Sequence, residues 1–110
     1  MKILLDQGTP VPIRSFLKKH FVRTAAQQQW ATLRNGDLLH AAEEAGFELL
    51  LTTDRNIGYQ QNLTLRRIAI LVIDIQQWPE LRPHVQEIVD AVDRTTPGGY
   101  TELDLQRHLS

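Results

Sequence analysis

Short apolar runs alternate along this chain with segments of helical periodicity, and no other feature of the sequence restricts the fold as strongly. Apolar runs predict buried strands over residues 2–5, 21–24, 48–52 and 68–73. Helical spacing predicts helices over residues 10–19, over residues 35–46, and from Pro79 to the turn at Pro97. Strands that alternate with helices form a parallel sheet with both faces covered. The predicted fold class is therefore α/β: a single-domain three-layer α/β/α sandwich around a parallel sheet of about four strands, in the order 2-1-3-4.

Length and composition are those of one globular domain. The chain has 110 residues, of which 42% are hydrophobic and 23% charged, and these values exclude a disordered or collagen-like chain. We predict one domain over residues 1–97 and a C-terminal tail over residues 98–110. The absence of cysteine excludes a disulfide framework, thiolate metal sites and a cysteine nucleophile. Because no apolar run is long enough to cross a bilayer, and Asp6 interrupts the N-terminal run, we expect a cytoplasmic protein without a membrane partner.

Aspartates follow three of the predicted strands. Asp6 follows the first strand, Asp54 the third and Asp74 the fourth, and Asp37 lies in the first turn of the helix that leads into the third. All strands of a parallel sheet end at one edge, where the helix feeding the next strand also begins. We therefore expect Asp6, Asp37 and Asp54 to face one crevice, at the point where the strand order reverses. For Asp74, after the strand farthest from the first, we expect a structural or solvent-facing role.

Acidic residues gathered in this way need a compensating charge. Two carboxylates about 4 Å apart repel each other by about 4 kcal/mol at an effective dielectric constant of about 20. Either protonation or a bound cation relieves this repulsion. Mg²⁺ and Mn²⁺ accept ligand sets made of a few carboxylates and waters, and they keep positions open for a phosphate oxygen and an attacking water. The acidic set therefore favours phosphodiester hydrolysis.

Some of these residues also have purely structural explanations. Asp37 at a helix start would complement the helix dipole, an effect of about 0.3–1 kcal/mol, and Asp54 would cap the following segment, an effect of about 1 kcal/mol. Asp6 has no such explanation, since Thr9 already supplies the cap of the next helix. His40, three residues after Asp37, is either an ordinary surface histidine or a hydrogen-bond donor or phosphate contact at the rim of the crevice.

The formal net charge of −1 conceals an uneven distribution of charge. Residues 7–36 contain no acidic residue and five basic ones: Arg14, Lys18, Lys19, Arg23 and Arg34. Such a segment predicts either a surface that contacts phosphate or an ordinary solvated helix face. If a metal ion is bound, Arg55, next to Asp54, is the cation that we expect nearest to it. Arg34 is the next candidate, for a contact with the scissile phosphate.

Three stretches of the sequence, taken together, are similar to the motifs of a known protein family. They are Met-Lys-Ile-Leu-Leu-Asp at 1–6, Asn-Gly-Asp-Leu-Leu-His-Ala-Ala-Glu-Glu-Ala-Gly at 35–46 and Leu-Leu-Leu-Thr-Thr-Asp at 49–54. Together they resemble the PIN-like domain family, and more narrowly its short bacterial branch, over most of residues 1–75. This resemblance implies a parallel α/β fold whose acidic pocket binds Mg²⁺ or Mn²⁺ and cleaves RNA, as in VapC-type toxins.

The resemblance also assigns roles to individual residues. Asp6 corresponds to the first acid of the family, Asp37 to the acid at the helix start and Asp54 to the acid of the Thr-x-Asp motif, whose threonine is Thr52. It implies RNA as the substrate, an antitoxin protein as a partner, and a homodimer. The sequence departs from the pattern of PIN nucleases in having no glutamate within residues 7–36.

Two functions from different classes remain open at this point. The first is a Mg²⁺- or Mn²⁺-dependent ribonuclease of the PIN type that hydrolyses RNA phosphodiesters, with a role as the toxin of a toxin–antitoxin pair. The second is a catalytically weak or inactive PIN-like module that binds RNA or a protein partner. The missing glutamate favours the second, as do two further departures: Gln7 where the short branch often has an acid, and Ile57 where an aromatic residue is usual.

Overall fold

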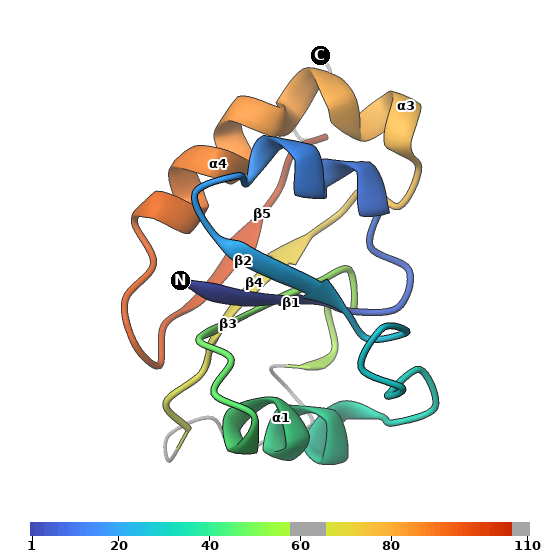
Figure 1. Cartoon of the computed structure of the whole chain (residues 1–110). Helices are drawn as coiled ribbons and strands as arrows, with labels where there is room; N and C mark the ends of the chain where they lie inside the picture. The colour runs from blue at the N-terminus through green and yellow to red at the C-terminus, as the bar shows by residue number, and fades with distance from the viewer. Residues whose placement is uncertain (58–65, 107–110) are drawn as a thin grey trace.

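A parallel β-sheet forms the centre of the molecule. The computed structural model describes residues 1–57 and 66–106, and within them five parallel strands form one sheet in the order β2-β1-β3-β4-β5 (Figure 1). The strands are β1 (Lys2–Leu5), β2 (Phe21–Thr24), β3 (Leu49–Thr52), β4 (Ala69–Ile73) and β5 (Tyr100–Leu103). The predicted order 2-1-3-4 is confirmed for the first four strands, and β5 adds a fifth beyond β4.

The fifth strand corrects the prediction of a tail over residues 98–110. Gly98, with a φ of 74°, turns the chain, and its N–H donates to the Arg67 carbonyl at 2.8 Å. β5 then pairs with β4 through a register that sets Val72 beside Glu102. An edge strand need not be apolar, and most of β5 is exposed, so its sequence lacks the apolar run that predicted the other strands. Residues 107–110 of the predicted tail lie outside the described part of the chain.

Helical segments cover both faces of the sheet, as Figure 1 shows. They are η1 (Val11–Phe16), α3 (Trp78–Leu81), η3 (Arg82–His84) and α4 (Val85–Asp93) on one face, and α1 (Asn35–Glu44) on the other. Ile3 and Leu5 of β1 contribute to the core beneath the first group, whereas Leu4 contributes to the core beneath α1. The predicted three-layer arrangement is confirmed. Because β3 and β4 are buried on both faces, their sequences are continuously apolar.

Two predicted helices differ from those observed, and proline accounts for the second difference. The segment predicted as a helix over residues 10–19 is the short 3₁₀ helix η1, which ends at Phe16. The helix predicted from Pro79 onward begins at Trp78 and is interrupted by the 3₁₀ turn η3, which contains Pro83. Its second part, α4, buries Ile88 and other apolar residues in the core.

The helix predicted over residues 35–46 is observed as α1, with small shifts at both ends. Arg34 rather than Asn35 occupies the N-cap position. Gly46, with a φ of 84°, reverses the chain after the helix, a conformation that glycine adopts without the strain of a side chain. Within residues 1–57 and 66–106, no helix has the length and apolar character needed to span a membrane.

Candidate functional site

The carboxyl ends of the two central strands, β1 and β3, hold three side chains together. Asp6 follows β1, and its backbone N–H donates to the Leu51 carbonyl at 2.9 Å, so that β1 and β3 stay paired one residue further. The hydroxyl of Thr52, a fully buried residue, donates to Asp6 Oδ2 at 2.7 Å. The same Oγ1 accepts a hydrogen bond from the Asp54 N–H at 3.0 Å. Thr52 thus ties the Asp6 carboxylate to the backbone of Asp54, and we name these residues the Asp6–Thr52–Asp54 unit.

The two carboxylates of this unit are partly satisfied by neighbouring backbone groups. Asp6 Oδ1 accepts from the Gln7 N–H at 2.7 Å, and Asp54 Oδ1 accepts from the Asn56 N–H at 2.9 Å. Burial raises the pKa of Asp6 above its ordinary value, and the nearby negative charge of Asp54 acts in the same direction. The hydrogen bonds from Thr52 and Gln7 lower the pKa of Asp6 and offset part of this effect. Asp6 therefore lies where its negative charge is poorly compensated.

The donor set of the unit fits a hard divalent cation. Among residues 1–57 and 66–106, neither Asp6 nor Asp54 forms an ion pair with a lysine, arginine or histidine. A carboxylate offers about four lone-pair sites, so both groups retain acceptor capacity beyond the hydrogen bonds described above. Oxygen ligands of this kind are those that Mg²⁺ and Mn²⁺ prefer. The two carboxylates repel each other and are half-buried at the lining of a cleft, which is the situation that a bound cation relieves.

Asp6 and Asp54 of this unit line an open cleft of about 740 Å³ at the carboxyl edge of the sheet, and Thr52 is buried behind them. This volume is within the range of sites that hold small ligands in proteins. Its lining comes from α1 and the loop before it, and from the segments that follow β1, β3 and β4. The lining residues outside the unit include Gln7, Leu33, Arg34, Leu38, Arg55 and Gln76.

Asp37, the third predicted acid, does not line this cleft. Arg34 and Leu38 of the same helical turn do, and Leu38 is buried in the core beneath α1. Successive helical residues are rotated by about 100°, so burying Leu38 leaves Asp37 exposed. Across the described ranges 1–57 and 66–106, no three histidine or acidic side chains lie together as a group that could hold a metal ion. The structure thus brings Asp6 and Asp54 together, and Asp37 remains beside the cleft wall.

The basic segment over residues 7–36 does not form one face around the cleft. Arg34 lines the cleft, but Arg23 is engaged elsewhere, because its Nε donates to Gln28 Oε1 at 2.7 Å. Lys18 and Lys19 precede the start of β2, and the parallel sheet places that start at the edge opposite the cleft. Of the five basic residues, Arg34 is the one that lines the cleft among the described residues, and contact with phosphate stays a prediction.

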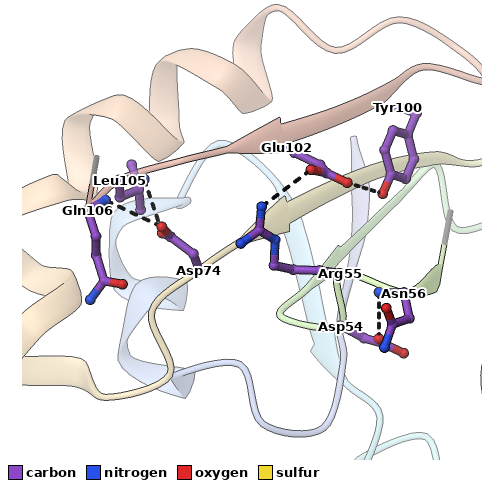
Figure 2. A network of polar contacts seen from close by, with 8 residues as sticks. All are labelled: Asp54, Arg55, Asn56, Asp74, Tyr100, Glu102, Leu105 and Gln106. Carbon is purple, nitrogen blue, oxygen red and sulfur yellow. Dashed lines mark hydrogen bonds and ion pairs between the residues drawn. The ribbon is translucent and has the colours of Figure 1, made fainter. Parts of the chain in front are cut away.

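Arg55, the cation expected nearest to a metal ion, is directed away from the carboxylates. Figure 2 shows its side chain extending from the end of β3 toward Glu102 of β5, on the far side from Asp54. The distance between Arg55 Nη2 and Glu102 Oε1 is 3.8 Å. Glu102 Oε2 in turn accepts a hydrogen bond from the Tyr100 hydroxyl at 2.7 Å. This pairing could not be predicted from the sequence, since it depends on β5, a strand that was not predicted.

Two further residues considered in the sequence, His40 and Asp74, do not line the cleft. His40 is exposed on α1, where its Nε2 lies 3.1 Å from Glu44 Oε1, and it does not line the cleft. The Asp74 carboxylate accepts hydrogen bonds from the backbone N–H groups of Leu105 and Gln106, at 3.1 and 3.3 Å. Figure 2 shows Asp74 holding the turn that follows β5 in this way. The structural role expected for Asp74 is confirmed.

A second hollow continues the cleft toward β5. Its volume is about 500 Å³, and it shares Thr53, Arg55 and Gln76 with the cleft. Gln76 Nε2 donates to Thr53 Oγ1 at 3.3 Å across the boundary between the two hollows. Sequence reasoning did not select Gln76, although it follows β4 by three residues and thus obeys the same strand-end rule as the aspartates.

Comparisons with protein-family models, with curated proteins and with solved structures give no significant match to this chain. The assignment of function therefore depends on the geometry of the cleft and on the sequence motifs that line it.

Proposed function

We propose that this chain is a Mg²⁺- or Mn²⁺-dependent ribonuclease of the PIN-like type that hydrolyses RNA phosphodiesters. The observation that carries the proposal is the Asp6–Thr52–Asp54 unit. It places two carboxylates without a basic partner, among the described residues, in an open cleft. The unit lies where the strand order reverses, which is the place where open α/β sheets bind ligands. Each of its residues belongs to a motif that resembles the PIN-like family.

In this proposal, each residue of the site has a role that follows from its chemistry. Asp6 and Asp54 hold the cation, and Asp37, in the first turn of α1, is the candidate for a further, water-mediated contact. Thr52 fixes the orientation of the Asp6 carboxylate and so limits the positions that the ligand oxygens can take. Arg34, in the cleft wall, binds the phosphate group of the substrate. When bound, such a cation supplies positive charge that stabilises the phosphate in the transition state and lowers the pKa of water.

The proposal is tested by metal binding and RNA cleavage together. Mn²⁺ is expected to raise the melting temperature of the wild-type protein, because a ligand that binds only the folded state stabilises it. The Asp6→Asn and Asp54→Asn variants are expected to lose that increase and to lose cleavage of single-stranded RNA in Mn²⁺. Glu80→Gln is the matched control for charge, since Glu80 is an exposed acid that lines the second hollow and not the cleft with Asp6 and Asp54. If the wild type shows neither a Mn²⁺-dependent rise in melting temperature nor cleavage, the proposed function is wrong.

A second candidate function is a PIN-like module that binds RNA or a protein partner without cutting RNA. The specific observation in its favour is that Asp37 stands outside the cleft lining, so that two acids rather than three face the cleft. A cation held by two carboxylates fills more of its coordination shell with water and binds more weakly. Stabilisation by Mn²⁺ together with intact RNA would select this second function. The family resemblance implies an antitoxin and a second copy of the chain as protein partners under either function.

A further inference from the structure

Arg55 is a basic residue whose side chain could interfere with the proposed cation site. It follows Asp54 directly in the sequence and lines the cleft. An arginine side chain is long and flexible, and its guanidinium binds carboxylates in a two-pronged geometry. If the Arg55 guanidinium turned toward Asp54 or Asp6, it would occupy the acceptor sites that a divalent cation needs.

The structure shows the Arg55 guanidinium engaged by another carboxylate instead. Arg55 Nη2 lies 3.8 Å from Glu102 Oε1, and the Tyr100 hydroxyl holds Glu102 Oε2 at 2.7 Å (Figure 2). Glu102 is fixed to the sheet through the register of β5, which sets it beside Val72 of β4. The side chain that attracts Arg55 therefore belongs to a strand of the same rigid sheet that positions Asp6 and Asp54.

We propose that Glu102 is a positioning residue that draws Arg55 toward β5 and thereby keeps the Asp6 and Asp54 carboxylates open to a divalent cation. The inference rests on the proposed cation site, but it assigns a function to residues outside that site. It also gives a role to β5, because the competing carboxylate is supplied by the edge strand. Arg55 and Glu102 are partly exposed to solvent, with side-chain exposures of 62% and 34%, so the bias that the pair provides is small and depends on ionic strength.

The experiment is a double-mutant cycle on Mn²⁺ affinity, measured by isothermal titration calorimetry at low salt. Glu102→Gln is expected to weaken Mn²⁺ binding about two- to fivefold, because an exposed ion pair provides a bias of this size. Arg55→Ala is expected to bind Mn²⁺ at least as tightly as the wild type. The double variant is expected to bind Mn²⁺ as tightly as Arg55→Ala does. Once the Arg55 guanidinium is removed, no group competes with the cation for Asp6 and Asp54, so Glu102 has no further effect.

The cycle separates positioning from a direct effect of charge. If the double variant loses as much affinity relative to Arg55→Ala as Glu102→Gln loses relative to the wild type, Glu102 attracts the cation directly and the inference is overturned. Glu80→Gln is the control for charge, since it removes one negative charge beside the second hollow. It is expected to change Mn²⁺ affinity less than Glu102→Gln does. Thermal melts of all variants in EDTA verify that each is folded.

A measurement without metal distinguishes failure of this inference from failure of the proposed function. In the metal-free Glu102→Gln variant, NMR is expected to show nuclear Overhauser contacts between the Arg55 side chain and the Asp54 Hβ protons that the wild type lacks. If these contacts appear but the wild type does not bind Mn²⁺, the proposed function fails and the positioning of Arg55 by Glu102 stands. If the Arg55 contacts are the same in both proteins, the inference is wrong even where Mn²⁺ binds.

Discussion

Burying the Asp6 carboxylate in this site lowers the free energy of unfolding of the protein when the group is ionised. The carboxylate is removed from water at the end of a buried strand and faces a second carboxylate, and both effects raise its pKa. Hydrogen bonds from the Thr52 hydroxyl and the Gln7 N–H hold the group in place but do not neutralise it. A group of this kind reduces the stability of the folded protein when it is ionised, and such a cost is common in residues that serve binding or catalysis.

This cost predicts a pH dependence for the Asp6→Asn variant. Below the ordinary pKa of 3.8 the carboxyl is protonated in the folded and unfolded states alike, so it contributes no electrostatic penalty. As the pH rises through the raised pKa of the folded state, the wild type loses stability that the asparagine variant keeps. The free energy of unfolding of Asp6→Asn minus that of the wild type should therefore increase from acidic to neutral pH.

Urea denaturation in EDTA at several pH values measures this difference. Each unit by which the pKa differs between the folded and unfolded states corresponds to about 1.4 kcal/mol. Asparagine has one accepting oxygen and can keep only one of the two hydrogen bonds that Asp6 accepts from Thr52 and Gln7. The loss of the other lowers the stability of the variant by a nearly constant amount, so the slope with pH isolates the charge. A difference that decreases toward neutral pH would contradict the raised pKa of Asp6.

At the scale of elements, the sequence predicted the four strands that contain apolar runs and missed β5, which is mostly exposed. β3 and β4 lie between two helical layers, and their unbroken apolar runs follow from that position. β5 lies at the edge, where Tyr100 to Glu102 are exposed, and its pattern is that of a polar loop. Its pairing with β4 depends on the turn at Gly98 and on Asp74, and neither contact is visible from the segment itself.

The attachment of β5 gives a prediction about stability. Leu105 follows β5 and is 2% exposed in the core beneath α4. Leu105→Ala is expected to lower the free energy of unfolding by about 2–4 kcal/mol, the range found when a buried leucine is truncated. Thr101→Ala, at an exposed position of β5, is expected to change it by less than about 0.5 kcal/mol. Equal effects of the two substitutions in chemical denaturation would show that residues 100–106 are not part of the cooperative fold.

At the scale of the whole molecule, positive charge is divided between the two edges of the sheet. Arg34 lines the cleft at the carboxyl edge, whereas Lys18 and Lys19 lie near the opposite edge. A run of basic residues in the sequence thus does not become one surface in space. The α/β crossover is the reason, because the chain travels from the carboxyl edge back to the amino edge between β1 and β2.

This division of charge predicts which basic residues contribute to RNA binding. Arg34→Ala is expected to weaken binding of a labelled single-stranded RNA several-fold and to reduce the salt dependence of log K by about 0.7, the contribution of one phosphate contact. The double variant Lys18→Ala/Lys19→Ala is expected to change the affinity less than twofold. Fluorescence anisotropy in EDTA, where the RNA stays intact, measures both. A larger loss from the lysine pair would place the RNA at the other edge.

The sequence by itself determined the order of the four strands β2-β1-β3-β4 and the meeting of Asp6, Thr52 and Asp54 at one edge. These features depend on strand direction, and strand direction follows from local apolar runs and short crossovers. The tertiary structure alone decided that Asp37 is exposed, that Arg55 pairs with Glu102, and that residues 100–103 complete the sheet. The Arg55–Glu102 pair and the pairing of β5 with β4 both join segments that lie tens of residues apart in the sequence. Local sequence patterns do not contain such contacts.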